Sequence, residues 1–227
     1  MSPRTRGGAS MPPGCDRVSG CAVRAGAACG AGATGAAGRH AVGQQERLAG
    51  NDARRREGRM GHGRVRRHRA GDRGAWAEFS PCGRWRYVLA RRWAAGPGLL
   101  CVLLNPSRAD AVRNDPTLLR CVARAQRLGF GGLRVVNLFA WRARDPAALG
   151  RAVDPVGPEN DAALLRGARW ADRILCGWGA GGRRSGRDAE VLRLLGRRRL
   201  WHLGLTAGGQ PRHPLYVGYE VAPQEWR

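Results

Sequence analysis

Polar side chains follow the apolar run at 99–104, where a buried strand is expected to end. Asn105, Pro106 and Ser107 come directly after this run, and the carboxylate of Asp110 follows. Pro106 fixes its own φ and keeps Asn105 out of the helical region, so the carboxamide is held in one orientation. A carboxamide can hydrogen-bond both the donor and the acceptor edge of a heterocycle. These residues are candidate ligand contacts, and the alternative is that Asn105 only stabilises a turn.

Three later segments also combine an apolar run with a chemically useful end. They are VVNLFAW, with Asn137 and Phe139; GWGAGG, with Trp178 and Gly179; and TAGGQPRHPLY, with Arg212 and His213. An imidazole can stabilise a developing oxyanion, and an indole can stack on a base. Each segment also has a structural interpretation. Asn137 could bond only backbone groups, and the indole of Trp178 could pack in the core.

The spacing of apolar residues predicts the elements that must position these side chains. Strands are expected at 84–93, 99–104, 133–141, 172–179 and 200–206. Helices are expected at 116–128, 145–152, 157–171 and 186–198. Asp115 and Asp145 each precede a proline at a predicted helix start, which is typical of N-caps. Gly129 suits the position just after the first helix.

This order predicts an α/β protein. We expect a three-layer α/β/α sandwich with a central, mostly parallel four-stranded sheet plus an N-terminal antiparallel hairpin strand. The carboxyl ends of parallel strands lie at one edge of the sheet, where ligands of open α/β folds bind. The four strand-end segments should therefore frame one pocket.

The first third of the chain differs in composition from the rest. Residues 1–75 are rich in Gly, Ala and Arg and have few large apolar side chains, so we expect a disordered tail. Residues 76–227 are expected to form a single α/β domain. Two alternatives remain open: a basic nucleic-acid-binding tail, or a true start near Met60 with a mis-assigned upstream segment.

The formal net charge is +23, and every basic side chain apart from histidine is arginine. Arginine clusters bind phosphate, although a coding bias toward arginine would weaken this argument for a nucleic-acid partner.

Other features exclude several classes of protein. The seven cysteines include no C-x-x-C pair, so zinc-ribbon and dithiol redox sites lack their signature. We expect no metal and no cofactor. No segment approaches the roughly 20 apolar residues of a membrane span, and no secretory signal is evident. We therefore expect a cytoplasmic protein without a membrane partner, and favour a monomer.

The chain resembles the bacterial family called domain of unknown function 1643. The matching segments cover about residues 79–220: CGRWRYVLARRW, LLNPSRADAVRNDPTLLRC, VVNLFAWRARDPAAL, DPVGPENDAALL, GWGAGG and LGLTAGGQPRHPLY. The family name implies no activity.

The order of the strand-end segments is also similar to that of the uracil-DNA glycosylase superfamily. This resemblance implies hydrolysis of an N-glycosidic bond, with Asn105 holding the water, Asn137 reading the base edge and His213 stabilising the departing base. The sequence departs from that pattern at Leu103, where the glycosylases have glycine, and after Pro214, where they have Ser-Pro.

These observations predict a nucleobase-recognising protein that is a glycosylase-like hydrolase of DNA or RNA. The alternatives are a non-catalytic nucleic-acid or nucleotide-binding protein and an enzyme of free nucleosides or nucleotides. In the first case Asn105, His213 and Asp110 would be catalytic. The substrate-binding residues would be Pro106, Ser107, Asn137, Phe139, Trp178, Gly179 and Arg212.

Overall fold

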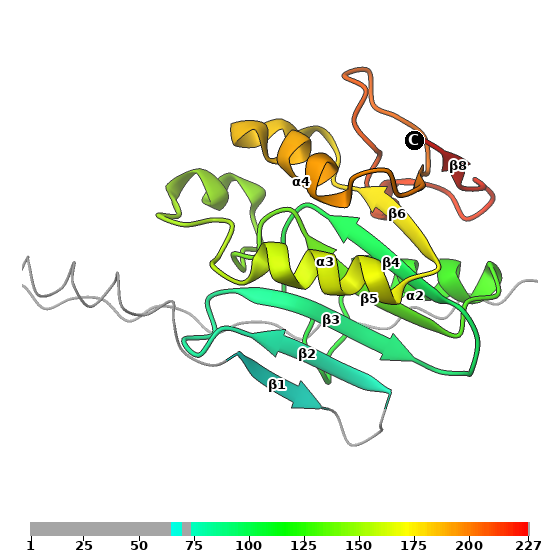
Figure 1. Cartoon of the computed structure of the whole chain (residues 1–227), viewed down its shortest axis with the longest axis horizontal. Coiled ribbons are helices and arrows are strands. Elements are labelled where there is room, and N and C mark those ends of the chain that lie inside the picture. The colour runs from blue at the N-terminus through cyan, green and yellow to red at the C-terminus, as the bar shows by residue number, and fades with distance from the viewer. Residues whose placement is uncertain (1–64, 70–73, 227) are drawn as a thin grey trace, which may run out of the picture. The chain divides into compact units, whose positions relative to one another are not determined.

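The computed structural model describes residues 65–69 and 74–226, which form a mixed α/β structure around one eight-stranded sheet (Figure 1). The strands are β1 (Arg66–Arg69), β2 (Ala75–Phe79), β3 (Arg86–Arg92), β4 (Gly98–Leu103), β5 (Gly132–Asn137), β6 (Arg173–Gly177), β7 (Leu200–His202) and β8 (Gln224–Glu225). The helices are α2 (Pro116–Arg127), α3 (Asn160–Trp170) and α4 (Arg187–Leu195), with short 3₁₀ segments η1 (Pro146–Arg151), η2 (Ala180–Gly186) and η3 (Pro214–Tyr216).

The strand order is β1-β2-β3-β5-β4-β6-β7-β8. Strand β4 pairs in parallel with β5 and β6, and β6 pairs in parallel with β7. Strands β1, β2 and β3 extend one side of the sheet in antiparallel fashion, and β8 extends the other. The sheet is thus larger than the four strands and one hairpin strand that we expected. In addition, β3 pairs with β5 rather than with β4, which follows it in sequence.

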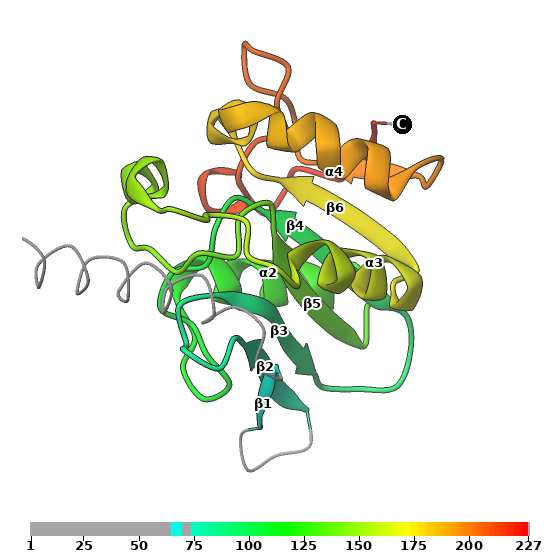
Figure 2. The ribbon, with the colours of Figure 1, turned by 60° about the vertical axis from the view of Figure 1, so that its left-hand side comes forward.

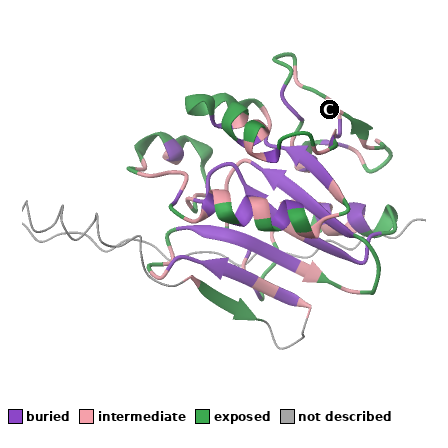
Figure 3. Ribbon diagram, viewed as in Figure 1, coloured by how far each residue is buried: buried purple, intermediate pink, exposed green. Residues whose placement is uncertain are grey.

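Strand β4 shows how the sheet separates two cores. Leu100 and Val102 belong to one buried cluster, whereas Leu99, Cys101 and Leu103 belong to the other, as the two-residue period of a strand requires. Helices α3 and α4 pack in the first cluster and α2 in the second, so helices cover both faces (Figure 2). All six residues of β4 are buried (Figure 3). Burial along its whole length holds β4 in place, so the residues that directly follow this strand have a rigid support.

Helix α2 begins and ends as its sequence predicts. The Asp115 side chain accepts a hydrogen bond from the backbone N–H of Leu118 at 2.8 Å, and Pro116 follows as the first helical residue. Gly129 takes a φ of +79° just beyond the helix, a conformation that favours glycine. The N-cap at Asp145 is also confirmed, because its side chain accepts from Ala147 N–H at 2.9 Å.

Most of the predicted tail, including the proposed start at Met60, lies outside the described residues. Within residues 1–75 the structure nevertheless describes β1, which pairs with β2 over four residues. The arginine-rich segment at 66–69 therefore belongs to the sheet. Among residues 65–69 and 74–226, no helix is both long and apolar enough to cross a membrane.

Candidate functional site

A cavity of about 630 Å³ lies where the parallel strands β4, β6 and β7 end. We call it the strand-end cavity. Its walls come from the segments after these strands, from the start of α2, from the loop at 143–146 and from η3. Six residues predicted from the sequence line it: Asn105, Ser107, Trp178, Gly179, Arg212 and His213. The edge at which the sequence predicted a pocket therefore contains one.

The Asn105 side chain is held in one orientation by backbone groups. Its Nδ2 donates to the carbonyl of Ala143 at 2.9 Å and to that of Pro106 at 3.2 Å. The buried Pro106 carbonyl also accepts from Ala143 N–H at 2.9 Å, which ties the two loops together. Both amide hydrogens of Asn105 are thus committed to the protein. The oxygen Oδ1 remains available as an acceptor for a ligand or a water molecule.

His213 presents a fixed hydrogen-bond donor to the cavity. Its Nδ1 accepts from the backbone N–H of Leu215 at 3.3 Å, so in the neutral ring the proton sits on Nε2. Burial lowers the pKa of His213 below its usual value of 6.5, and the nearby Asp115 carboxylate opposes this shift. The ring is therefore neutral at pH 7 and acts there as an N–H donor rather than a cation.

Asp115 is a cavity residue for which the sequence favours a role as a helix N-cap. It lines the strand-end cavity together with Thr117 from the first turn of α2. One carboxylate oxygen, Oδ1, caps the helix, and the other has no hydrogen bond within the described part of the chain. Its place before Pro116 favours capping, and the structure shows the cap. Capping does not exclude a second role in the cavity, because the same side chain lines it.

Four predicted site residues do not line the strand-end cavity: the buried Pro106, and also Asn137, Phe139 and Asp110. Asn137 is 1 % exposed and does not line the cavity, and its Oδ1 lies 3.4 Å from Nη2 of Arg86. Phe139 is buried in the core beside α3 and α4. Asp110 lies outside the strand-end cavity, and its Oδ1 accepts from Val112 and Arg113 N–H at 2.8 and 2.7 Å.

Desolvation raises the pKa of Asp110, but these two backbone hydrogen bonds outweigh it and leave the pKa below its usual value. The carboxylate of Asp110 is therefore a turn-stabilising anion.

A small chamber of about 40 Å³ shares several lining residues with the strand-end cavity and has room for ordered water. Arg86, Asn105, Asp115 and His213 all contribute to its lining. Arg86 is 4 % exposed, donates from Nη1 to the Ala109 carbonyl at 2.7 Å and leaves Nε without a partner. Burial lowers the pKa of Arg86 to about 10, and Asp115 works against this shift. Arg86 thus remains a cation at neutral pH and is a site-proximal charge that sequence reasoning missed.

A hydrogen-bonded chain stiffens one wall of the cavity. The indole Nε1 of Trp178 donates to Gln210 Oε1 at 2.6 Å, and Gln210 Nε2 donates to Asp188 Oδ2 at 2.9 Å. Gly182 packs so closely that an added Cβ would lie 2.0 Å from Cδ1 of Trp178. Trp178 is 1 % exposed and forms a fixed wall.

Family comparison agrees with the segments that frame this cavity. A family model described as protein of unknown function (DUF1643) matches residues 86–215, from Arg86 to Leu215 and over more than half of the chain. The chain belongs to the DUF1643 family. This confirms the family predicted from the strand-end segments. No curated protein and no solved structure matches this DUF1643 chain.

The donor set of the DUF1643 site is a carboxamide, a carboxylate, an imidazole and hydroxyls. Within residues 65–69 and 74–226, no group of three or more His, Cys, Asp or Glu side chains is arranged to hold a metal ion. The chemistry that these side chains can perform on their own is hydrogen bonding to a polar ligand and proton transfer.

Proposed function

We propose that this DUF1643 protein recognises a nucleobase in the strand-end cavity and hydrolyses its N-glycosidic bond. The observation that carries the proposal is that Asn105, Asp115 and His213 reach one cavity from three different elements. A volume of about 630 Å³ suits a nucleoside-sized ligand. In this interpretation the fold is a three-layer α/β/α sandwich, and the site occupies the carboxyl edge of its parallel strands.

The three side chains have complementary roles in this reaction. Oδ1 of Asn105 accepts a hydrogen bond from the attacking water, and the free oxygen of Asp115 accepts its proton. The water oxygen bonds to the anomeric carbon while the carbon–nitrogen bond breaks, and that electron pair leaves with the base. Nε2–H of His213 donates to the base oxygen on which negative charge develops.

Aromatic side chains suit the cavity to a flat ligand. Tyr216 is 75 % exposed beside His213, with ring centroids 5.8 Å apart. An exposed ring at a cavity mouth can stack on a base. Because Asn137 is buried and does not line the cavity, the edge of the base would be read by the hydroxyls of Ser107 and Thr117 and not by a second carboxamide.

The resemblance of the sequence to the uracil-DNA glycosylase superfamily supports the same reaction, but only through Asn105 and His213.

A non-catalytic nucleotide-binding role is the second candidate, and one observation favours it. Asp115 uses Oδ1 to cap α2, and this structural role is sufficient to explain the carboxylate without a role in catalysis.

Base release is the experiment that tests the proposal. Single- and double-stranded oligonucleotides carrying uracil, hypoxanthine, xanthine or mismatches are incubated with the protein, treated with alkali and separated on a gel. Asn105→Ala and His213→Ala should each reduce release by about 10²–10³-fold. Tyr216→Ala should weaken substrate binding, whereas Tyr219→Ala should not, because Tyr219 lies outside the cavity.

Substrate binding without release of any base would contradict the hydrolase and favour the binding protein. If both Asn105→Ala and His213→Ala still release the base, the reaction takes place outside this cavity.

A further inference from the structure

Two more hollows continue from the strand-end cavity across the surface. The middle hollow, of about 520 Å³, shares Ser107, Ala143 and Arg144 with the strand-end cavity. The β1 pocket, of about 440 Å³, shares Gly83, Asp110 and Arg142 with the middle hollow. The three hollows therefore have common walls and form one continuous path.

Arginine side chains border this path along the middle hollow and the β1 pocket. They are Arg66, Arg69, Arg84, Arg108, Arg113, Arg142 and Arg144, all of them exposed. Within the described residues none of the seven forms an ion pair. Unpaired guanidinium groups at a surface are free to bind phosphate oxygens, often through two parallel hydrogen bonds.

Acidic side chains are scarce along the same path. Asp110 and Asp115 are the carboxylates that line the three hollows, and each already accepts backbone hydrogen bonds. Other described carboxylates, such as Asp161, Asp188 and Glu190 near α3 and α4, line none of them. The excess of positive charge is thus a property of this path and not only of the overall composition.

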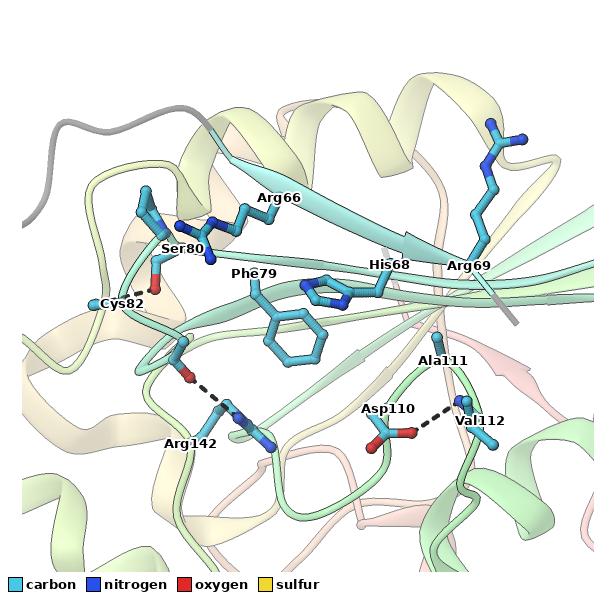
Figure 4. Close-up of a pocket in the computed structure, with 12 residues that line it drawn as sticks. Arg66, His68, Arg69, Phe79, Ser80, Cys82, Asp110, Ala111, Val112 and Arg142 are labelled. Atoms are coloured by element: carbon cyan, nitrogen blue, oxygen red, sulfur yellow. Dashed lines mark hydrogen bonds between the residues drawn. The ribbon is translucent and has the colours of Figure 1, made fainter. Parts of the chain in front are cut away.

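Each hollow also contains an aromatic ring. Figure 4 shows the ring of Phe79 in the β1 pocket, between His68 on one side and Arg142 on the other. The Arg142 guanidinium lies 5.0 Å from the centroid of Phe79. Trp141 lines the middle hollow and Tyr216 the strand-end cavity. Arginines alternating with aromatic rings are typical of surfaces that bind single-stranded nucleic acid.

We propose that this path binds a single strand of nucleic acid and leads it to the strand-end cavity. The inference rests on the proposed function in one respect: the strand presents one of its bases to that cavity. The arginines contact successive phosphates. The exposed Tyr216 and the half-buried Trp141 contact unpaired bases, whereas the buried Phe79 supports Arg142 from beneath. The partner is a polymer with several phosphates, not a free nucleotide.

The test measures binding by fluorescence anisotropy with a labelled single strand of about twelve nucleotides, over about 50–200 mM salt. The test variant combines Arg84→Gln, Arg108→Gln and Arg113→Gln. The control variant combines Arg169→Gln, Arg193→Gln and Arg197→Gln, which changes the net charge equally but alters exposed residues outside the path.

The test variant should bind at least tenfold more weakly at low salt, and the control variant should bind as the unmodified protein does. The slope of log K against log salt should become shallower by about two, because each lost phosphate contact on a single strand removes about 0.7. The six arginines replaced in the two variants form no side-chain hydrogen bond within the described residues, so both variants should fold, and circular dichroism checks this.

Equal losses of affinity in the two variants would overturn the proposed binding path, because such losses would depend on net charge alone. Tighter binding of a duplex of the same sequence, or equal binding of polyglutamate, would overturn single-stranded nucleic acid as the occupant. Asn105→Ala and His213→Ala separate this inference from the proposed function. If they bind the strand normally and the unmodified protein releases no base, the path stands and the hydrolase fails.

Discussion

The His213 ring can be tested through its protonation. Its Nδ1 already accepts the Leu215 N–H, so a second proton on the ring would break that hydrogen bond inside a partly buried site. Burial accordingly lowers the pKa of the ring, against the opposing effect of Asp115. The unfolded chain then binds this proton more readily than the folded protein does.

We predict that His213 destabilises the fold in acid. Its contribution is fully favourable above pH 6.5 and is lost as the pH falls through the folded-state pKa. Urea unfolding of the protein and of His213→Asn between about pH 4 and 8 measures the difference. The wild-type chain should lose more stability than the variant below pH 6. The comparison is needed because burial also lowers the pKa of His202. Parallel pH profiles for the two proteins would contradict the prediction.

At residue scale, the sequence predicted several of the side chains that line the cavity but not the charged groups next to them. The Asn-Pro and His-Pro pairs located Asn105 and His213 because proline restricts the backbone beside it. Asn137 was misplaced because an apolar run does not reveal on which side of a strand end a polar residue lies. Arg86 was missed since its alternation with apolar residues is typical of an exposed strand position, whereas its side chain is buried.

Helix α2 depends on Asp115 for its start, and the same carboxylate faces the cavity. Asp115→Ala should lower the free energy of unfolding by about 0.5–2 kcal/mol, because the N–H of Leu118 loses its acceptor. Asp115→Asn should keep near-normal stability, since asparagine caps helices equally well. Thermal or urea unfolding of the two variants measures this.

The variant Asp115→Asn also distinguishes a capping role of this residue from a catalytic role. If Asp115 accepts a proton in the reaction, Asp115→Asn should lose base release while remaining folded. Full activity in Asp115→Asn would restrict this residue to capping.

Helix α3 is held to the sheet by its buried face. Leu164 is completely buried in the cluster that also contains Leu100 and Val136, whereas the adjacent Leu165 is only partly buried. Leu164→Ala should therefore cost about 2–5 kcal/mol of unfolding free energy, and Leu165→Ala distinctly less. Denaturant midpoints of the two variants provide the comparison. Equal losses would mean that α3 does not pack as the structure shows.

The eight-stranded sheet shows where prediction from sequence ends. The apolar run of β4 and those of its parallel partners were identifiable because they are buried on both faces. Strand β1 has four exposed residues, RRHR, which in sequence are indistinguishable from a basic tail. It joins the sheet through backbone pairing with β2 and through the ion pair between Arg67 and the buried Glu78. A pairing made mainly by backbone groups leaves no pattern in side-chain hydrophobicity.

The chain carries a net charge of +23, and the part that the structure describes contains few ion pairs. Glu78 pairs with Arg67 and Arg166, and the buried Arg187 pairs with Asp161 and Glu190. Most other arginines among the described residues are exposed, and their like charges repel one another. Repulsion between exposed charges more than about 8–10 Å apart is screened at physiological salt. Added salt should therefore stabilise the folded protein, because its charges are closer together than those of the unfolded chain.

We predict that the thermal midpoint rises as sodium chloride increases from about 20 to 500 mM. The triple variant Arg169→Gln, Arg193→Gln and Arg197→Gln should show a higher midpoint at low salt and a flatter salt dependence, since it carries three fewer repelling charges. Differential scanning fluorimetry across the salt series measures both effects. A midpoint that falls with salt would mean that the Glu78 and Arg187 ion pairs outweigh the repulsion. In that case local contacts within the protein would already offset the repulsion among the arginines. An anionic partner would then not be needed to neutralise their charge.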